Sequence, residues 1–353
     1  MNDRRTVVFY ISGHGFGHAS RAIEVANALV ERRPDTRIFI RSAVAPWLVA
    51  RTANAGIELS STQVDTGVVQ IDSLNLDAAS SIELAERFMS AIDERVETEV
   101  SFLSAHDAAM TVSDLPALGI ASGVAAGVPA IALGNFTWDW IYEHYRGGAA
   151  VARQIGEIYS HATTALRLPM WGGFATMPKI VDVPFVARRS RRDPEEVRTA
   201  LNIPLDRRVV LTSFGGYGLD GLNVEALHAL SGYHVLLPGM IDEDAMYGRG
   251  FRYEDLVRAV DVVVSKPGYG IISECLANDT ALLYTSRGDF REYPVLVEAM
   301  PKFLRCEFID HDDLFAGRWQ RHLDDVIAQP EPPTRPAVNG ADVAADILLD
   351  ILE

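Results

Sequence analysis

The feature that most constrains the fold is an order of elements that occurs twice along the chain. A short β-branched run leads through a glycine-containing turn into the start of a helix, first in "TVVFYISGHGFGHASR" and again in "DVVVSKPGYGIISE". Strands that alternate with helices in this way form parallel sheets with helices on both faces. The sequence therefore predicts an α/β protein with two Rossmann-like, doubly wound domains that face each other across a cleft.

The length of 353 residues also favours two domains, because a single hydrophobic core stops growing at about 250–300 residues. A stretch rich in proline and arginine, from Met170 to Pro204, interrupts the alternation of strands and helices. We place the domain boundary there, with a first domain at 1–180 and a second at 181–337. The last helix, 338–353, is expected to pack back onto the first domain.

Several individual elements follow from the pattern of apolar residues in the first half. Short β-branched runs predict strands, and longer amphipathic stretches predict helices. The predicted strands are 6–12, 37–41, 109–112 and 130–133, and the predicted helices are 19–32, 82–105, 117–126 and 149–160.

The net charge of the chain argues against nucleic acid as a partner. Lys and Arg total 32 against 48 Asp and Glu, which gives a formal charge of −16 and a surface that repels a phosphate backbone. The basic run within the linker is interpreted as a solvated surface, because charge runs usually are. It consists of Arg188, Arg189, Arg191 and Arg192.

The cysteines and the apolar runs indicate the compartment. Cys275 and Cys306 are the two cysteines of the chain, and neither lies in a CxxC pair or near a histidine cluster, so we predict no disulfide framework and no metal site. The apolar run at the N-terminus spans about seven residues and is predicted to be a strand. No apolar stretch approaches the roughly 20 residues of a membrane span. We therefore expect a cytoplasmic protein without a transmembrane segment.

The first glycine-rich turn carries the strongest catalytic signal. Gly13, Gly15 and Gly17 lead into a helix whose free N–H groups favour an anion. The turn lacks the P-loop pattern, and a dinucleotide fingerprint fails because His18 stands where its third glycine would be. An imidazole at a helix N-terminus suits proton transfer near pH 7, so His18 is the candidate base, with His14 beside it. The alternative is that either histidine only caps the helix.

The second glycine-rich turn predicts a nucleotide site. Ser273 and Glu274 lie in the first turns of the helix that follows it, where backbone amides can hold a diphosphate. An acidic side chain here can accept both hydroxyls of a ribose, although Glu274 also suits the helix dipole without any ligand. Gly215 and Gly216, in "SFGGYG", add further amides beside the same site.

An aromatic segment, "GNFTWDWIYEHY", is the third candidate region. Sugars stack on aromatic faces, although helical spacing could equally send Trp140 and Tyr142 into the core. Asp139 is the polar residue most out of place among these rings.

These motifs resemble the GT-B glycosyltransferases. "GHGFGHASR", "VSDLPALGIASGVAAGVPAIALGNFTWDWIYEHY" and "SKPGYGIISECLANDTALLYTSRGDFREYP" look like the glycosyltransferase-like N-terminal domain of plant L-arabinokinases, over most of the chain, and more distantly like the peptidoglycan N-acetylglucosaminyltransferase. The resemblance implies a metal-independent enzyme without a cofactor. Its second domain would bind a nucleoside-diphosphate sugar, with UDP as the expected nucleotide, and an unknown acceptor would bind the first.

The resemblance also implies roles for individual residues. His18 would lie near the acceptor hydroxyl, Glu274 would bind the ribose, and Lys266 would pair with a phosphate. The catalytic base would be His18 or a neighbouring carboxylate such as Asp114 or Asp139. The other donor-side positions are the diphosphate loop and the contacts to sugar hydroxyls, namely Gly268, Tyr269, Gly270, Asp289 and Glu292. The acidic-Gln pair common at the sugar position is replaced here by "GDFREYP". A non-catalytic nucleotide-sugar-binding module and a nucleotide-sugar 2-epimerase therefore stay open as alternatives.

Overall fold

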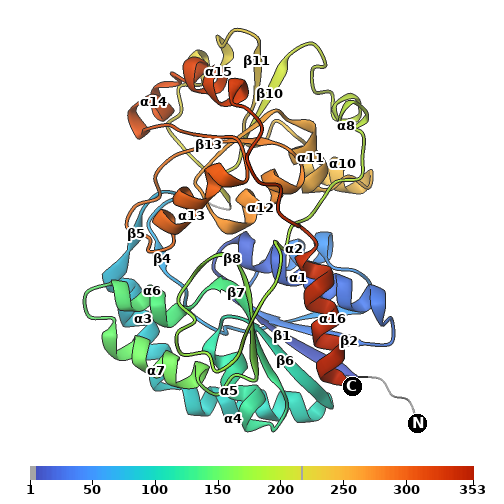
Figure 1. The fold of residues 1–353 in the computed structure, drawn as a ribbon, viewed down its shortest axis with the longest axis vertical. Helices are drawn as coiled ribbons and strands as arrows, with labels where there is room; N and C mark the ends of the chain where they lie inside the picture. Colours follow the sequence, from blue (N-terminus) through green and yellow to red (C-terminus); the bar gives the residue numbers. More distant parts are fainter. Residues whose placement is uncertain (1–4, 216–217) are drawn as a thin grey trace.

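The computed structural model describes residues 5–215 and 218–353, which form two lobes stacked along the long axis (Figure 1). The first lobe is an α/β unit built around one large sheet. Its elements are β1 (Thr6–Ile11), α1 (Phe16–Arg32), β2 (Arg37–Ser42), α2 (Pro46–Thr52), β3 (Ile57–Ser61), β4 (Val69–Gln70), β5 (Leu76–Asp77), α3 (Ala78–Ser90), α4 (Ile92–Ala105), β6 (Ala108–Asp114), α5 (Ala117–Ala125), β7 (Ala130–Phe136), α6 (Trp138–His144), α7 (Ala149–Tyr159), β8 (Thr164–Gly172) and β9 (Ile180–Asp182).

The strand order of the first sheet fixes where a ligand can bind. Among the described residues its order is β3-β2-β1-β6-β7-β8-β9, and the pairs are parallel. The order reverses between β1 and β6, and open α/β sheets bind ligands outside the carboxyl ends of the strands at such a point. Both the turn after β1 and the last residue of β6, Asp114, lie there.

The second lobe repeats the design with a smaller sheet. Its elements are α8 (Pro194–Ala200), β10 (Arg208–Thr212), α9 (Val224–His228), β11 (Tyr233–Leu236), α10 (Glu243–Gly248), α11 (Tyr253–Ala259), β12 (Val262–Ser265), α12 (Tyr269–Ala277), β13 (Ala281–Tyr284), α13 (Tyr293–Ala299), a 3₁₀ turn (Met300–Lys302), β14 (Cys306–Phe308), α14 (His311–Ala316) and α15 (Gln320–Ala328). The parallel strands run β11-β10-β12-β13-β14, so the order reverses between β10 and β12. These two sheets confirm the predicted fold class.

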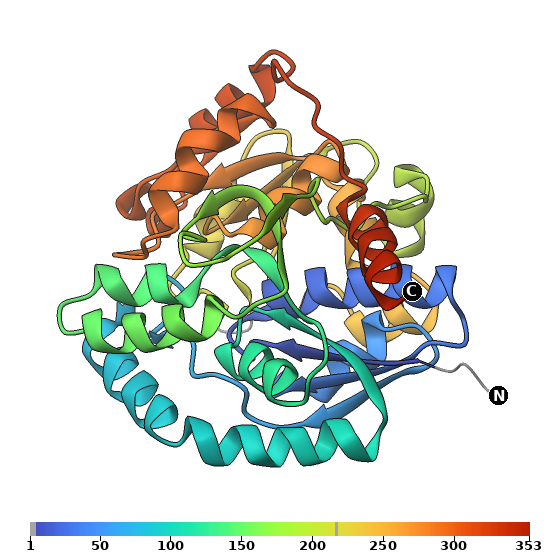
Figure 2. The ribbon, with the colours of Figure 1, turned by 60° about the horizontal axis from the view of Figure 1, so that its bottom comes forward.

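The C-terminal helix α16 (Gly340–Leu352) returns to the first lobe, where it lies against α1 (Figures 1 and 2). Arg32 at the end of α1 pairs with Asp342 and Asp346 of α16. The last strand of the first sheet, β9, spans residues 180–182. On this basis we propose that the first domain extends to residue 182 rather than 180.

The local predictions hold with one difference. The helix predicted over 82–105 is two helices, α3 and α4, which are separated at Ala91. α4 covers the outer face of the first sheet in Figure 2. No helix in the described part of the chain is both long and apolar enough to cross a membrane.

Helix starts differ across the molecule in a way that bears on function. Asp77, Asp193 and Asp310 cap α3, α8 and α14 by accepting hydrogen bonds from backbone N–H groups. α1 and α12 begin after Gly15 and Gly268 without a side-chain cap, as do α2, α4, α5, α6 and α7. What sets α1 and α12 apart is that their N-terminal turns approach each other from opposite lobes, where their first N–H groups can meet a ligand.

Candidate active site

His18 and Asp114 form a dyad at the switch point of the first sheet. Asp114 ends β6, His18 lies in the first turn of α1, and the His18 Nδ1 atom is 2.8 Å from the Asp114 Oδ1 atom. Both side chains are buried. An ionised carboxylate accepts the Nδ1 proton, which leaves the lone pair on Nε2, so we assign this tautomer to the ring. A histidine held in this way can act as a general base.

Arg21, one turn further along α1, neutralises the carboxylate of this dyad. Its Nε and Nη2 atoms donate to the two Asp114 oxygens at 2.7 and 2.6 Å. Burial by itself would raise the pKa of Asp114, but the charges of Arg21 and His18 outweigh it and hold that pKa below its usual value. Asp114 therefore stays ionised, as a partner that fixes the histidine must.

The dyad is connected to the second lobe through buried polar side chains. Arg21 Nη1 donates to Asn135 Oδ1 at 2.5 Å, and Asn135 Nδ2 donates to Glu292 Oε1 at 2.6 Å. Arg287 Nη1 lies 3.3 Å from the other oxygen of Glu292. The side chain of Asn135 therefore links Glu292, which is predicted to contact the donor sugar, to Arg21, the arginine that pairs with Asp114.

The aromatic segment forms the wall around His18. The Trp138 ring stacks on the imidazole with ring centroids 6.0 Å apart, and Phe136 meets it edge-on at 5.5 Å. Trp138 and Tyr142 are each only 2% exposed, so these rings belong to the core rather than to an open stacking platform.

Asp139, a predicted catalytic residue, is not part of the cluster around His18. Its Oδ1 atom accepts from the Trp140 N–H at 2.7 Å, and its Oδ2 atom accepts from the Thr176 hydroxyl at 3.0 Å. Asp139 also lies against Gly156 of α7. These contacts give Asp139 a local structural role at the start of α6, because both its oxygens are turned toward neighbouring backbone and α7.

Positive groups gather where the turns after β1 and β12 meet. Burial lowers the pKa of Lys266 to about 8, helped by the charge of Arg287. Burial also lowers the pKa of Arg287. His14 faces the same cluster, and its pKa falls to about 3 through burial and the charges of His18, Arg287 and Lys266. Cations whose charged forms are disfavoured in this way would be stabilised by an anion.

Two uncapped helix starts converge on this cluster. A Cβ atom on Gly270 would lie 3.2 Å from the Gly17 Cα atom, so α1 and α12 approach each other through glycines from opposite lobes. Tyr269 is not directed to a ligand, because its hydroxyl accepts from the Val186 N–H at 3.1 Å and Arg21 lies over its ring.

Glu274 has a partner that the sequence did not predict. Arg188 of the linker donates from Nε to the Glu274 Oε1 atom at 2.7 Å and lies 3.7 Å from Glu254. Burial raises the pKa of Glu274 although Arg188 acts to lower it. Burial likewise raises the pKa of Glu24, on α1, to about 7. The interpretation of Arg188 as a solvated linker residue is therefore wrong, because its side chain is 12% exposed and pairs with largely buried glutamates.

The remaining predicted donor-side residues are Ser273, Gly215, Gly216 and Asp289. The Ser273 hydroxyl donates to the Gly270 carbonyl at 2.9 Å. Gly215 has a left-handed backbone conformation, with φ 73°, and a Cβ atom added to it would have no heavy atom within 4 Å. Gly216 lies outside the described residues. Asp289 is exposed and accepts from His144 Nε2 at 2.7 Å, so it joins the two lobes at the rim.

Closure of the lobes is completed by the loop that carries β4 and β5, which lies beside α13 in Figure 1. Ser73 of this loop donates to the Phe214 carbonyl at 3.2 Å and also to that of Gly218. Gly67 packs against His14 at the base of the loop.

Sequence reasoning missed Arg21, Asn135 and Arg287 as site residues. A signal existed for Asn135, because it is a polar residue near the end of a buried strand that adjoins β6. No local pattern marked Arg287, since its importance depends on the lobe that faces it.

No family model matches the chain. It is 31% identical over 357 residues to the L-arabinokinase of Arabidopsis thaliana, an alignment that covers 96% of this chain and 34% of that protein. The chain thus spans about a third of the length of this curated relative.

Solved structures with the same arrangement cover nearly the whole chain. The glycosyltransferase of kitacinnamycin has a TM-score of 0.64 at 16% identity, with 99% of both chains covered. A Medicago truncatula protein complexed with UDP-glucose has a TM-score of 0.63 at 12% identity, covering 100% of this chain and 99% of that one. UDP-glucose:anthocyanidin 3-O-glucosyltransferase, in complex with UDP, has a TM-score of 0.59 at 12% identity, covering 99% and 95%.

This chain has the GT-B glycosyltransferase fold. Within the GT-B fold, the His18 dyad belongs to the first lobe, while the Lys266 turn and Glu274 belong to the second. The two groups face each other where α1 meets α12.

Proposed function

We propose that this chain is a glycosyltransferase that moves a sugar from a nucleoside-diphosphate sugar to an acceptor hydroxyl. The observation that carries the proposal is the pairing of a carboxylate-held base, His18, with a cationic turn on the opposite lobe. A base and an anion site that face each other are what displacement at an anomeric carbon needs. UDP is the nucleotide we expect, since GT-B structures similar to this one contain UDP or UDP-glucose.

The proposed reaction is one displacement. His18 Nε2 takes the acceptor hydroxyl proton while the acceptor oxygen forms a bond to the anomeric carbon of the donor. The bond between that carbon and the diphosphate oxygen breaks, and the electron pair leaves with the diphosphate. Lys266, Arg287 and the free N–H groups of α1 and α12 stabilise the departing charge, which is the role a metal plays in other transferases.

Glu274 is the proposed ribose ligand. Both Arg188 contacts go to the Oε1 atom, so Oε2 is the oxygen we assign to a ribose hydroxyl. Arg188 would keep Glu274 ionised and oriented for this contact. Glu292, beside Arg287, is the residue we assign to a hydroxyl of the donor sugar.

The free state of both cysteines fits a reducing compartment, and we infer that the enzyme works in the cytoplasm.

The nucleotide site can be tested by thermal shift with UDP, GDP, dTDP and their glucose conjugates. Saturation at ~100 times the dissociation constant adds about 2.7 kcal/mol of stability. We expect a shift selective for one base, which is lost in Glu274→Gln and kept in Glu298→Gln, a matched change at an exposed glutamate.

Each outcome separates the candidate functions. If none of the nucleotides shifts the melting temperature, the proposed donor site is wrong. A shift without sugar transfer to any acceptor would favour the non-catalytic binding module, and conversion of the free nucleotide-sugar to its C2 epimer would favour the epimerase.

A further inference from the structure

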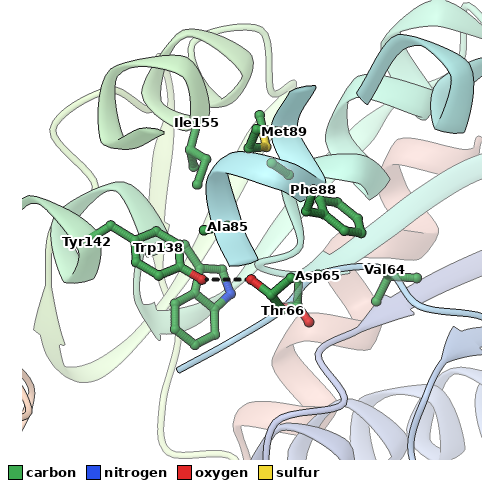
Figure 3. Close-up of a pocket in the computed structure, with 10 residues that line it drawn as sticks. Val64, Asp65, Thr66, Ala85, Phe88, Met89, Trp138, Tyr142 and Ile155 are labelled. Carbon is green, nitrogen blue, oxygen red and sulfur yellow. Dashed lines mark hydrogen bonds between the residues drawn. The ribbon is translucent and has the colours of Figure 1, made fainter. Parts of the chain in front are cut away.

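A small cavity lies in the first lobe beside Trp138, the ring that stacks on His18 (Figure 3). Its volume is about 20 Å³, which is the space for one water molecule or one hydroxyl group. The loop after β3 closes one side, and helices α3, α5, α6 and α7 close the others. Most of its lining is apolar, and its polar lining residues are Asp65, Thr66, Trp138 and Tyr142.

Two polar atoms of this cavity have no hydrogen-bond partner among the described residues. They are Asp65 Oδ2, an acceptor, and Trp138 Nε1, a donor, and both are buried. The Trp138 N–H nevertheless lies close enough to the Asp65 carboxyl to act to lower its pKa, as does the Ser12 hydroxyl. Figure 3 shows the indole nitrogen on the side of the ring that faces Asp65 and Thr66. Since unsatisfied buried polar atoms are costly, this pair is suited to a group that both donates and accepts. A hydroxyl group does both.

The cavity adjoins the proposed base. Trp138, which supplies the unpaired N–H, is the ring that stacks on His18. Burial raises the pKa of Asp65 to about 6, and Asp65 also interacts electrostatically with His18. An acceptor with its reacting hydroxyl at His18 would therefore present its neighbouring substituents to Asp65 and Trp138.

The cavity is held in shape before any ligand binds. The Tyr142 hydroxyl donates to the Gly67 carbonyl at 2.6 Å and lies 3.3 Å from the Thr66 hydroxyl. These contacts tie the loop after β3 to α6. Such a preformed cavity admits one polar group, whereas an aromatic or lipid acceptor would need an apolar pocket of several hundred Å³.

We propose that Asp65 and Trp138 form an acceptor subsite, which binds a second hydroxyl of a small polyhydroxylated acceptor, a sugar or a cyclitol, next to His18. The carboxylate of Asp65 accepts from that hydroxyl, and the indole N–H donates to its oxygen. Water occupies the position until the acceptor displaces it. The inference rests on the proposed transferase function, because it assigns the acceptor to the same site.

The test measures binding of polyols and of UDP as two separate titrations. Saturation-transfer NMR with myo-inositol, L-arabinose, D-xylose and their methyl glycosides detects ligand protons that lie close to the protein in the bound state, with 4-nitrophenol as the apolar probe. The variants are Asp65→Asn and Trp138→Phe, with the exposed Asp206→Asn as the matched control. The methyl glycosides stand for the terminal sugar of a larger acceptor.

We expect at least one polyol to bind the wild type saturably, with affinity about 10-fold lower in Asp65→Asn and Trp138→Phe and unchanged in Asp206→Asn. UDP should bind all four proteins equally. Polyol binding that is equal in wild type and Asp65→Asn, binding of 4-nitrophenol alone, or absence of any polyol binding while UDP still binds would each overturn the subsite. Loss of UDP binding in the wild type would instead overturn the donor site.

Discussion

The two switch points of this molecule are built on the same strand, turn and helix, yet they differ in how their charges are satisfied. At the first, the charges of Asp114 and Arg21 pair at 2.6–2.7 Å and both side chains are buried. At the second, the charge of Arg287 acts on Lys266, and the pKa of each is lowered by burial. The first switch point is paired without a ligand, whereas at the second Glu292 pairs with Arg287 and Lys266 has no carboxylate within ion-pair distance among the described residues.

This difference matches the two tasks of a displacement reaction. A base must keep one orientation and one tautomer throughout, so rigid neighbours are an advantage. A site for a leaving diphosphate gains most when its charges are poorly compensated before the charge develops. The comparison therefore predicts that damage at the first switch point affects rate and stability, whereas damage at the second affects nucleotide affinity and its pH dependence.

The largest effect is expected for His18→Ala. Loss of the general base should lower the rate of sugar transfer by roughly 10³- to 10⁴-fold, or about 4–5 kcal/mol of barrier. UDP affinity should stay within about twofold of wild type, because His18 belongs to the other lobe.

The measurement is the rate of UDP release in the presence of acceptor, with binding followed separately. His228→Ala, at the exposed end of α9, is the matched control. If the His18→Ala enzyme kept more than about a tenth of wild-type activity, His18 would not be the general base.

The next effect is on stability. Arg21→Met leaves Asp114 as a buried carboxylate whose remaining hydrogen-bond partner is His18, and breaking one partner of a buried pair costs about 3–5 kcal/mol. Without Arg21, burial dominates and the pKa of Asp114 rises. The loss of stability should therefore be greatest at neutral pH and shrink as pH falls through that raised pKa.

Urea unfolding at several pH values measures this loss. The double variant Arg21→Met/Asp114→Asn should recover part of it, because the unpaired charge is gone. If the single variant unfolds within about 1 kcal/mol of wild type at neutral pH, the first switch point is not held together by this pair.

The same contrast explains what the sequence could predict. Both turns, the element order and the C-terminal helix follow from local periodicity and glycine placement. His18 and Glu274 could be found because each follows a recognisable strand and turn. Arg188 and Asp65 could not, because the groups they meet, Glu274 and Trp138, lie far away in the chain. The strand-end position of Asn135 was a signal, but its contact with Glu292 of the other lobe was not predictable. Composition alone suggested that Arg188 is exposed to solvent. The acids that it meets, Glu24, Glu254 and Glu274, lie on α1, α11 and α12, far from the linker in sequence.

The smallest effect, and the one that sharpens the comparison most, concerns Lys266. Its pKa, about 8 in the free protein, should rise when a diphosphate binds, so UDP binding should take up a proton near pH 8. Below about pH 7 the amine is already charged and affinity is flat. Above pH 8 the free protein must first regain a proton, so affinity falls as pH increases. Lys266→Met should bind UDP about 10- to 100-fold more weakly, or roughly 2 kcal/mol, without that pH dependence.

Calorimetric titrations of UDP at pH 7 to 9.5, in two buffers with different ionisation enthalpies, report affinity and proton uptake together. Lys179→Met, at an exposed position near β9, should match the wild type in both. Equal proton uptake in wild type and Lys266→Met would mean that another group titrates on binding. An affinity that Lys266→Met leaves unchanged would show that the helix N-termini and Arg287 hold the diphosphate without this lysine, and that the charge imbalance at the second switch point serves something other than nucleotide binding.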